Sequence, residues 1–230
     1  MKILMLSKKN KHCNKVSKYL LNYFPNSKIL IGEKGESLPK IDESYDYLIS
    51  YLSPWIIPEY ILDKMKFSIN FHPGCPKYPG IGCYNFAIYN QETEYGVTCH
   101  HMLPKVDSGS IIKVNRFRIN KEITVKELKD ISMKNMFFQF SQIMTYIKNN
   151  KELPNSEEKW QRVPYKRKDL QRLCKLDISM NNKEIKKRVQ ATFFPYAKDL
   201  PFLILHDIKF ILSEKDYINF LKDKQFRGEI

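Results

Sequence analysis

Hydrophobic positions in the first 150 residues alternate between two patterns. Short apolar runs are typical of buried strands, whereas apolar residues spaced three and four positions apart are typical of helices. Strands separated by helical segments indicate an α/β domain with a largely parallel sheet. The predicted strands are 2–6, 27–31, 47–52, 67–71, 94–102 and 110–118, and the predicted helices are 12–23, a short one opened by Pro58, 84–89 and 124–147.

The last third of the chain has a weaker pattern. Residues 149–169 are polar, charged and interrupted by two prolines, which predicts a linker. Beyond it we predict a helix over 182–192 and a hairpin formed by 202–205 and 209–212. A lone hairpin is marginal in water, so we expect this tail to pack on the main domain or on another subunit. The predicted domains are therefore 1–150, and 151–230 as linker plus helix and hairpin extension.

Length and composition narrow the class of protein. A chain of 230 residues suits one substantial domain with an appendage. No segment approaches the run of about 20 apolar residues that a membrane helix needs, and lysines follow the first apolar run where a signal peptide would have a cleavage site. Five cysteines without a CxxC pair do not form a disulfide framework. We therefore expect a cytoplasmic protein with reduced thiols and no membrane partner.

The net charge of +14 raises the question of a nucleic-acid partner. A concentrated basic face attracts phosphates, but the excess charge here is mostly lysine and is spread along the chain. We interpret it as a solvated lysine surface and do not expect nucleic-acid binding, although a basic RNA-binding protein remains the alternative from a different class. An anionic small substrate is compatible with the charge.

Three side chains suggest chemistry. Asn70 and His72 are two positions apart at the end of a predicted strand, so they point to the same side of the sheet. Ligands of parallel α/β sheets bind beyond such strand ends. An imidazole beside the carboxylate of Asp107 can accept a proton, and an asparagine amide can stabilise an oxyanion by about 3 kcal/mol. Together these groups are suited to acyl transfer without a covalent nucleophile.

Each of these residues also has a structural interpretation. A histidine at a strand end is commonly a hydrogen-bonded structural residue, and Asp107-Ser108-Gly109 is by itself an ordinary turn sequence. Physical reasoning from the single residues leaves the two interpretations open. No GxGxxG follows the first strand and no Walker A motif is present, which removes the usual support for a dinucleotide or ATP site.

A cluster of cysteines and histidines suggests two other sites, neither of which we favour. Their spacing matches none of the common zinc motifs, so we expect no metal. Cys75 near His72 suggests a thiolate nucleophile, but a cysteine between Gly74 and Pro76 in a turn is more commonly incidental. The cluster consists of Cys75, Cys83, Cys99, His72, His100 and His101.

Three ordered pieces of sequence resemble a known family. They are Ser-Ile-Asn-Phe-His-Pro-Gly-Cys-Pro-Lys-Tyr-Pro-Gly at 68–80, Gly-Val-Thr at 96–98 and Val-Asp-Ser-Gly-Ser-Ile-Ile at 106–112. In this order and spacing they resemble the formyltransferases that use 10-formyltetrahydrofolate. The resemblance implies a Rossmann-like formyltransferase core with a mainly parallel twisted sheet, in which residues 1–150 hold the folate and substrate sites.

The resemblance also implies roles for the candidate residues. His72 would be the base or proton shuttle, Asn70 the oxyanion donor, and Asp107 the group that orients His72. The loop 54–58 is similar to the family segment that holds the pterin, although a packed strand-to-helix corner explains the same residues. The cofactor-binding residues implied in this way are Trp55, Ile56, Ile57 and Val106.

Three residues after the candidate catalytic strand are expected to contact the substrate. Lys77 would supply charge to a diphosphate, or be a solvated loop lysine. Tyr84 would stack on a base, or cap the helix that follows it. Tyr78, between them, completes this predicted substrate-binding set.

The formylated amine is the least determined part of the interpretation. Family members act on glycinamide ribonucleotide, on methionyl-tRNA, and on amino sugars linked to nucleoside diphosphates. Residues 165–170 and 188–196 most resemble the sugar-nucleotide N-formyltransferases, whose final hairpin commonly helps form a homodimer. This resemblance implies formylation of a dTDP-, GDP- or UDP-linked amino dideoxy sugar for a surface polysaccharide such as the lipopolysaccharide O-antigen.

Two observations bear on this assignment. The tRNA enzyme usually carries a β-barrel after the catalytic domain, for which the residues after 150 are too few, although the positive charge favours it. The chain also reaches Asn70 sooner than family members generally do. The first half is therefore expected to lack a strand and a helix, which puts the folate contacts from that region in doubt.

Overall fold

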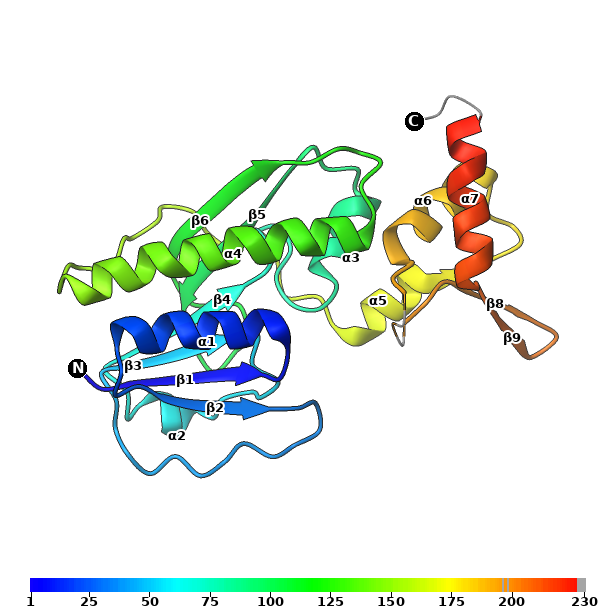
Figure 1. The fold of residues 1–230 in the computed structure, drawn as a ribbon. Helices are drawn as coiled ribbons and strands as arrows, with labels where there is room; N and C mark the ends of the chain where they lie inside the picture. The colour runs from blue at the N-terminus through cyan, green and yellow to red at the C-terminus, as the bar shows by residue number, and fades with distance from the viewer. Residues whose placement is uncertain (196, 198, 227–230) are drawn as a thin grey trace. The chain divides into compact units, whose positions relative to one another are not determined.

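The computed structural model describes residues 1–195, 197 and 199–226, with side chains described to residue 222. These residues form two compact units. Figure 1 shows their helices and strands, coloured from blue at the N-terminus to red at the C-terminus. The first unit comprises residues 1–79, 96–116 and 132–164, and the second comprises the described part of 80–95, 117–131 and 165–230. Each unit is therefore assembled from segments that are distant in the sequence.

A six-stranded sheet forms the core of the first unit, in the order β2-β1-β3-β4-β5-β6. β1 pairs with β2 and β3 in parallel, β3 pairs with β4 in parallel, and β5 runs antiparallel to β4. The predicted α/β fold with a mainly parallel sheet is confirmed. The strands are β1 Ile3–Lys8, β2 Lys28–Gly32, β3 Tyr47–Tyr51, β4 Phe67–His72, β5 Glu94–His101 and β6 Ile111–Arg118.

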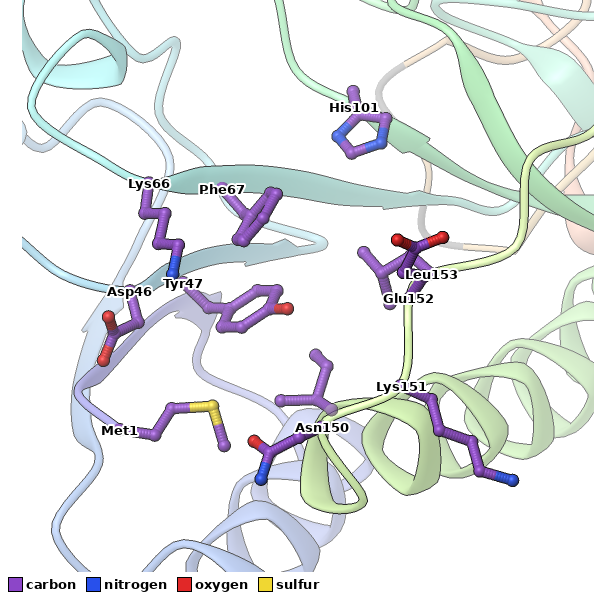
Figure 2. Close-up of a pocket in the computed structure, with 11 residues that line it drawn as sticks. Met1, Asp46, Tyr47, Lys66, Phe67, His101, Asn150, Lys151, Glu152 and Leu153 are labelled. Atoms are coloured by element: carbon purple, nitrogen blue, oxygen red, sulfur yellow. The ribbon is translucent and has the colours of Figure 1, made fainter.

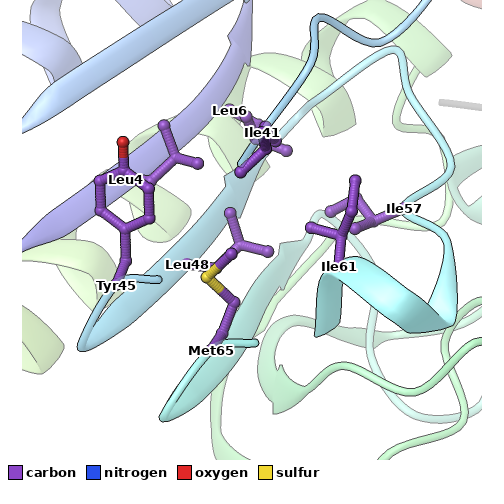
Figure 3. Packing of buried hydrophobic residues seen from close by; sticks show 8 residues of the cluster. All are labelled: Leu4, Leu6, Ile41, Tyr45, Leu48, Ile57, Ile61 and Met65. Carbon is purple, nitrogen blue, oxygen red and sulfur yellow. The ribbon is translucent and has the colours of Figure 1, made fainter. Parts of the chain in front are cut away.

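One face of the sheet is covered without a long helix (Figure 3). Side chains from β1 and β3 pack there against the connection 33–46 and against the short helix α2, Glu59–Leu62. The connection between β2 and β3 contains no helix, and its buried Ile41 and Tyr45 cover the strands instead. The cluster consists of Leu4, Leu6, Ile41, Tyr45, Leu48, Ile57, Ile61 and Met65.

The other face is covered by α1, Lys11–Tyr23, and by the part of α4, Val125–Lys148, that belongs to the first unit. Phe140 of α4 is fully buried, and its ring centroid lies 5.5 Å from that of Tyr51 and 5.2 Å from that of Phe71. Coverage of both faces explains why β1 is continuously apolar from Ile3 to Leu6. Neither α4 nor any other helix in the described residues is long and apolar enough to cross a membrane.

Local signals define the start of α4. The Glu127 backbone N–H donates to Thr124 Oγ1 at 3.2 Å, and the Thr124 backbone N–H donates to Glu127 Oε2 at 2.8 Å. This is the reciprocal capping box expected from the sequence, and it satisfies two backbone donors that the first helical turn leaves free.

The second unit contains a three-stranded sheet, ordered β7-β8-β9, and four helices in its described residues. The predicted helix and hairpin are confirmed, and the hairpin turn places His206 and Asp207 at φ 47° and 62°, as a two-residue turn with matching twist requires. Its elements are α3 Cys83–Tyr89, α5 Arg167–Cys174, β7 Lys175–Leu176, α6 Asn182–Thr192, β8 Phe202–Leu205, β9 Ile208–Ile211 and α7 Glu214–Phe226.

Two helices were not predicted. α5 begins inside the predicted linker and α7 follows the hairpin. Each has a short apolar stripe, which is a weak signal because packing against other elements stabilises such a helix more than its own propensity does. In α7, Tyr217 stacks on Phe193 with ring centroids 3.9 Å apart.

The extension packs on segments from within the predicted main domain, as expected. Asn85 Nδ2 donates to Ala191 O at 2.7 Å, and Gln190 Nε2 donates to Lys121 O at 2.8 Å. The domain boundary at residue 150 stays a prediction.

Burial on the sheet-facing side of α1 gives a stability prediction. Leu20 is fully buried, whereas its neighbour Leu21 is 37% exposed. We expect Leu20→Ala to lower the free energy of unfolding by about 2–5 kcal/mol, because the removed methyl groups leave a cavity. Leu21→Ala should lower it by less than about 1 kcal/mol. Urea denaturation followed by tryptophan fluorescence measures both, and equal losses would contradict this placement of α1.

Candidate active site

The candidate site is built on the end of β4 and on the antiparallel strand beside it. Asn70 and His72 lie on β4, and the pairing with β5 places Asn70 opposite His100 and His72 opposite Thr98. Side chains directly opposite each other on antiparallel strands lie about 5 Å apart at Cβ. His100 therefore joins the predicted residues through the strand register.

Asp107 reaches this group from the turn that follows β5. Its side chain is only 4% exposed, with Oδ2 3.2 Å from His72 Nδ1 and Oδ1 3.3 Å from His100 Nε2. The backbone of Asp107 has φ 45°, in the left-handed region that is uncommon for residues other than glycine. The predicted contact of His72 with Asp107 is present in the structure.

Hydrogen-bond geometry assigns the protons of His72. Its Nε2 lies 2.9 Å from Tyr78 O, and because a carbonyl oxygen only accepts, Nε2 carries a proton and donates. The other ring nitrogen, Nδ1, faces Asp107 Oδ2 at 3.2 Å. The two contacts together fix the orientation of the His72 ring.

His100 links the amide to the carboxylate. Its Nδ1 lies 2.7 Å from His101 O and so donates to it. Its Nε2 lies 3.0 Å from Asn70 Nδ2 and can accept one of the two amide hydrogens. Asn70 is thereby connected to Asp107 through a second histidine, which the sequence placed only in a rejected zinc cluster.

Trp160, from the predicted linker, is the other residue that sequence reasoning missed. Its ring lies edge-on to His100 and His72, with centroid distances of 5.0 Å and 5.8 Å. Its Nε1–H donates to Gly109 O at 2.8 Å, which ties the Asp107 turn to the linker. An aromatic residue in an otherwise polar linker is the signal that could have drawn attention to it.

The residues predicted to bind the cofactor have different environments. The Trp55 ring lies against Gly32, where a Cβ would be 2.1 Å from a ring carbon, and its Nε1–H donates to Glu36 O at 3.0 Å. Ile57 is buried in the core cluster. Ile56 and Val106, which are 74% and 47% exposed, present apolar surface.

The residues predicted to bind substrate also differ. Lys77 is exposed, whereas the Tyr78 side chain is 1% exposed and reaches His72 only through its carbonyl oxygen. Tyr84 lies on α3 in the second unit, where its ring centroid is 6.1 Å from that of Tyr95.

All five cysteines are buried. Burial raises the pKa of the Cys99 thiol far above its usual range, so this thiol stays protonated near neutral pH. Among the described residues, no group of three or more histidine, cysteine, aspartate or glutamate side chains is arranged to hold a metal ion.

A separate hollow of about 600 Å³ lies at the other end of β4 (Figure 2). Tyr47 and Phe67 stack there with ring centroids 5.0 Å apart, and His101 also lines it. Successive side chains of a strand point to opposite faces. His101 therefore faces this hollow while His100 faces Asn70, and burial together with the nearby His100 lowers the pKa of His101.

Comparison with known proteins finds similarity in both sequence and fold. Residues 43–135, which include Asn70, His72 and Asp107, match the family described as Formyl transferase. A methionyl-tRNA formyltransferase from Mycoplasmopsis pulmonis is 31% identical over 124 residues, which are 51% of this chain and 42% of that protein. The chain thus covers less than half the length of this relative.

Solved structures match over a longer range. A sugar N-formyltransferase from a Shewanella species has a TM-score of 0.77 at 17% identity, covering 93% of this chain and 96% of that one. An N-formyltransferase from Helicobacter canadensis, in complex with folinic acid and dTDP-3-aminofucose, has a TM-score of 0.68 at 21% identity, covering 83% and 80%. At these identities the likeness shows the fold.

The close packing of the Asp107 turn gives a second prediction. A methyl group on Gly109 would lie 1.9 Å from His101 O, so Gly109→Ala must displace the turn or the strand. We expect it to lower the free energy of unfolding by about 2–3 kcal/mol. Ser110→Ala, at the exposed neighbouring position, should change it by less than about 0.5 kcal/mol. Chemical denaturation compares the two variants, and similar stabilities would show that Gly109 is not needed for close approach.

Proposed function

We propose that this chain, whose residues 43–135 belong to the formyl transferase family, moves a formyl group from 10-formyltetrahydrofolate to the amine of a nucleotide-linked amino dideoxy sugar. The observation that carries the proposal is the buried group in which Asp107 contacts His72 and Asn70 is held beside them. An amide donor and a proton acceptor at one place are what attack of an amine on a formyl carbon needs.

The residues divide this chemistry between them. The reaction forms a bond from the substrate amine to the formyl carbon and breaks the bond from that carbon to N10 of the folate. One Nδ2 hydrogen of Asn70 is engaged by His100, and the second donates to the formyl oxygen as it gains negative charge. His72 Nδ1 takes the proton that the amine loses, and Asp107 stabilises the resulting imidazolium. Return of this proton to N10 as tetrahydrofolate leaves restores His72.

Exposed apolar side chains fit the folate co-substrate. A pterin is a flat ring system, and such ligands bind against apolar side chains with a few polar backbone groups. We assign this role to Ile56 and Val106, whose side chains are exposed, and to the backbone of the 54–58 loop. Trp55 and Ile57 act by packing this loop on β2 and on the core cluster.

Two observations support a sugar nucleotide as the formyl acceptor. The sugar N-formyltransferase fold accounts for 93% of this chain and 96% of the Shewanella chain, whereas the methionyl-tRNA formyltransferase match spans only 42% of that relative. The exposed ammonium group of Lys77 follows the catalytic strand and suits a diphosphate.

Methionyl-tRNA is the second candidate acceptor. It is supported by the 31% identity to the Mycoplasmopsis pulmonis enzyme and by the net charge of +14. We rank it below the sugar nucleotides because the match to the Shewanella sugar N-formyltransferase spans 93% of this chain, whereas the match to the Mycoplasmopsis pulmonis enzyme spans 51%.

A direct assay tests the proposed reaction. The protein is incubated with 10-formyltetrahydrofolate and, separately, with dTDP-, UDP- and GDP-linked amino sugars and with methionyl-tRNA. We expect an N-formylated sugar nucleotide, detected by mass spectrometry, with release of one tetrahydrofolate per formyl group. Asn70→Ala should lower kcat about 10²- to 10³-fold and His72→Ala about 10²- to 10⁴-fold.

The outcomes separate the alternatives. Formylation of methionyl-tRNA alone would replace the sugar assignment with the second candidate. No formylation of any acceptor, with a correctly folded protein, would refute the proposed activity. Salt-sensitive RNA binding that persists in Asn70→Ala and His72→Ala would instead support a non-catalytic RNA-binding protein.

We also propose that the β8–β9 hairpin forms a homodimer interface. β9 is the last strand of its sheet, and edge strands with apolar side chains readily pair with another chain. Five large apolar side chains on the hairpin are exposed, which is a surface that monomeric proteins usually avoid. They are Ile204, Leu205, Ile208, Phe210 and Ile211.

Charge placed on this hairpin tests the interface. Phe210 is 51% exposed on β9, and Ile178 is 76% exposed in the same unit but outside the hairpin. We expect Phe210→Glu to convert a dimer to a monomer in sedimentation velocity, because two carboxylates would be buried across the interface. Ile178→Glu should remain dimeric. A monomeric wild-type protein, or a dimeric Phe210→Glu variant, would contradict this assignment.

A further inference from the structure

We propose that His100 is a positioning residue, which fixes the orientation of the Asn70 amide so that an N–H faces the reacting oxygen. The expected effect on kcat rests on the proposed formyl transfer. The hydrogen bond between Asn70 Nδ2 and His100 Nε2 rests on the geometry alone. His100 was not among the predicted catalytic residues, and the effect assigned to it is to orient the amide of Asn70.

The His100 ring is held in one orientation by its burial and by two neighbours. The ring is 2% exposed, its Nδ1–H donates to His101 O at 2.7 Å, and the indole of Trp160 lies edge-on with an interplanar angle of 88°. A flip of the imidazole would leave the His101 carbonyl without this donor, at a cost of about 1–3 kcal/mol for a buried group. The neighbours therefore define Nε2 as the nitrogen that faces Asn70.

The fixed acceptor, His100 Nε2, determines that Nδ2 of the Asn70 amide, and not Oδ1, points toward His100. With Nδ1 protonated, the neutral His100 ring accepts at Nε2 from Asn70 Nδ2 at 3.0 Å. An inverted amide would place Oδ1 against the Nε2 lone pair, so the inverted orientation is disfavoured. The remaining Nδ2 hydrogen is then available to a substrate oxygen. An inverted amide would instead present an acceptor to a developing oxyanion and would oppose the reaction.

Two substitutions of His100 separate positioning from a structural role. His100→Leu removes the acceptor, whereas His100→Gln can place Oε1 near the Nε2 position and does not titrate. We expect kcat to fall about 10- to 100-fold in His100→Leu, a part of the effect of losing an oxyanion donor, with KM for both substrates nearly unchanged. His100→Gln should recover most of kcat, because its Oε1 can accept the hydrogen bond from Asn70 Nδ2.

A matched control is available at the next position. His101→Leu removes the neighbouring imidazole, which faces the hollow in Figure 2, and keeps the backbone carbonyl that holds His100. It should leave kcat within about twofold of wild type, as substitutions away from such contacts usually do. Wild-type kcat in His100→Leu would overturn the proposal. Equal losses in His100→Leu and His100→Gln, matched by equal losses of thermal stability, would also overturn it.

A spectroscopic measurement tests the geometry without the reaction. In ¹⁵N-labelled wild-type protein, the His100 ring should show the Nδ1–H tautomer near neutral pH, and the Asn70 side-chain amide should shift in His100→Leu more than in His101→Leu. An Nε2–H tautomer, or an Asn70 amide that does not respond to His100→Leu, would refute the inference. If the protein formylates none of the acceptors but these signals behave as expected, the proposed function fails and the hydrogen-bond assignment stands.

Discussion

A carboxylate buried between two imidazoles is the constraint on which the candidate site depends. Removing a carboxylate from water costs several kcal/mol even after relaxation, so the buried Asp107 depends on the polar groups that face its oxygens. His72 and His100 face these oxygens at 3.2 Å and 3.3 Å. Each imidazole donates from its other nitrogen to a backbone carbonyl, which fixes the orientation of the ring beside the carboxylate.

The fold supplies this arrangement through a change of strand direction. β1 to β4 are parallel. Because both faces of these strands are covered, few polar side chains occur in the middle of the strands. The antiparallel pairing of β5 with β4 then brings His100 directly opposite Asn70. The turn after β5 returns Asp107 to the same place, in a left-handed backbone conformation that costs about 1–2 kcal/mol for a residue other than glycine. Trp160 ties this turn to the linker through Gly109 O.

Helices and strands with a clear hydrophobic periodicity were predictable from sequence. The strands of the main sheet, the helix α6 and the hairpin were all found close to their predicted positions, because each has apolar residues at strand or helix spacing. α5 and α7 were missed because each has a short apolar stripe in a charged segment, and its stability comes from packing partners that a local pattern does not contain. In the site, the sequence identified Asn70, His72 and Asp107 but not His100 and Trp160. Their contacts join residues 30 or more positions apart, and only the strand register and the path of the linker bring them together.

The sequence by itself determined the residue types of the site, the order of the main strands and helices, and the match of residues 43–135 to the formyl transferase family. Periodicity and motif spacing are local properties of the chain, so they can be read without coordinates. Only the tertiary structure decided that Nδ1 of His72 faces Asp107, that Tyr78 contributes a carbonyl and not its ring, and that His100 stands between the amide and the carboxylate. The physical reason is that the protonation of a histidine nitrogen follows from what lies about 3 Å away from it, and in a folded chain those partners are set by long-range packing.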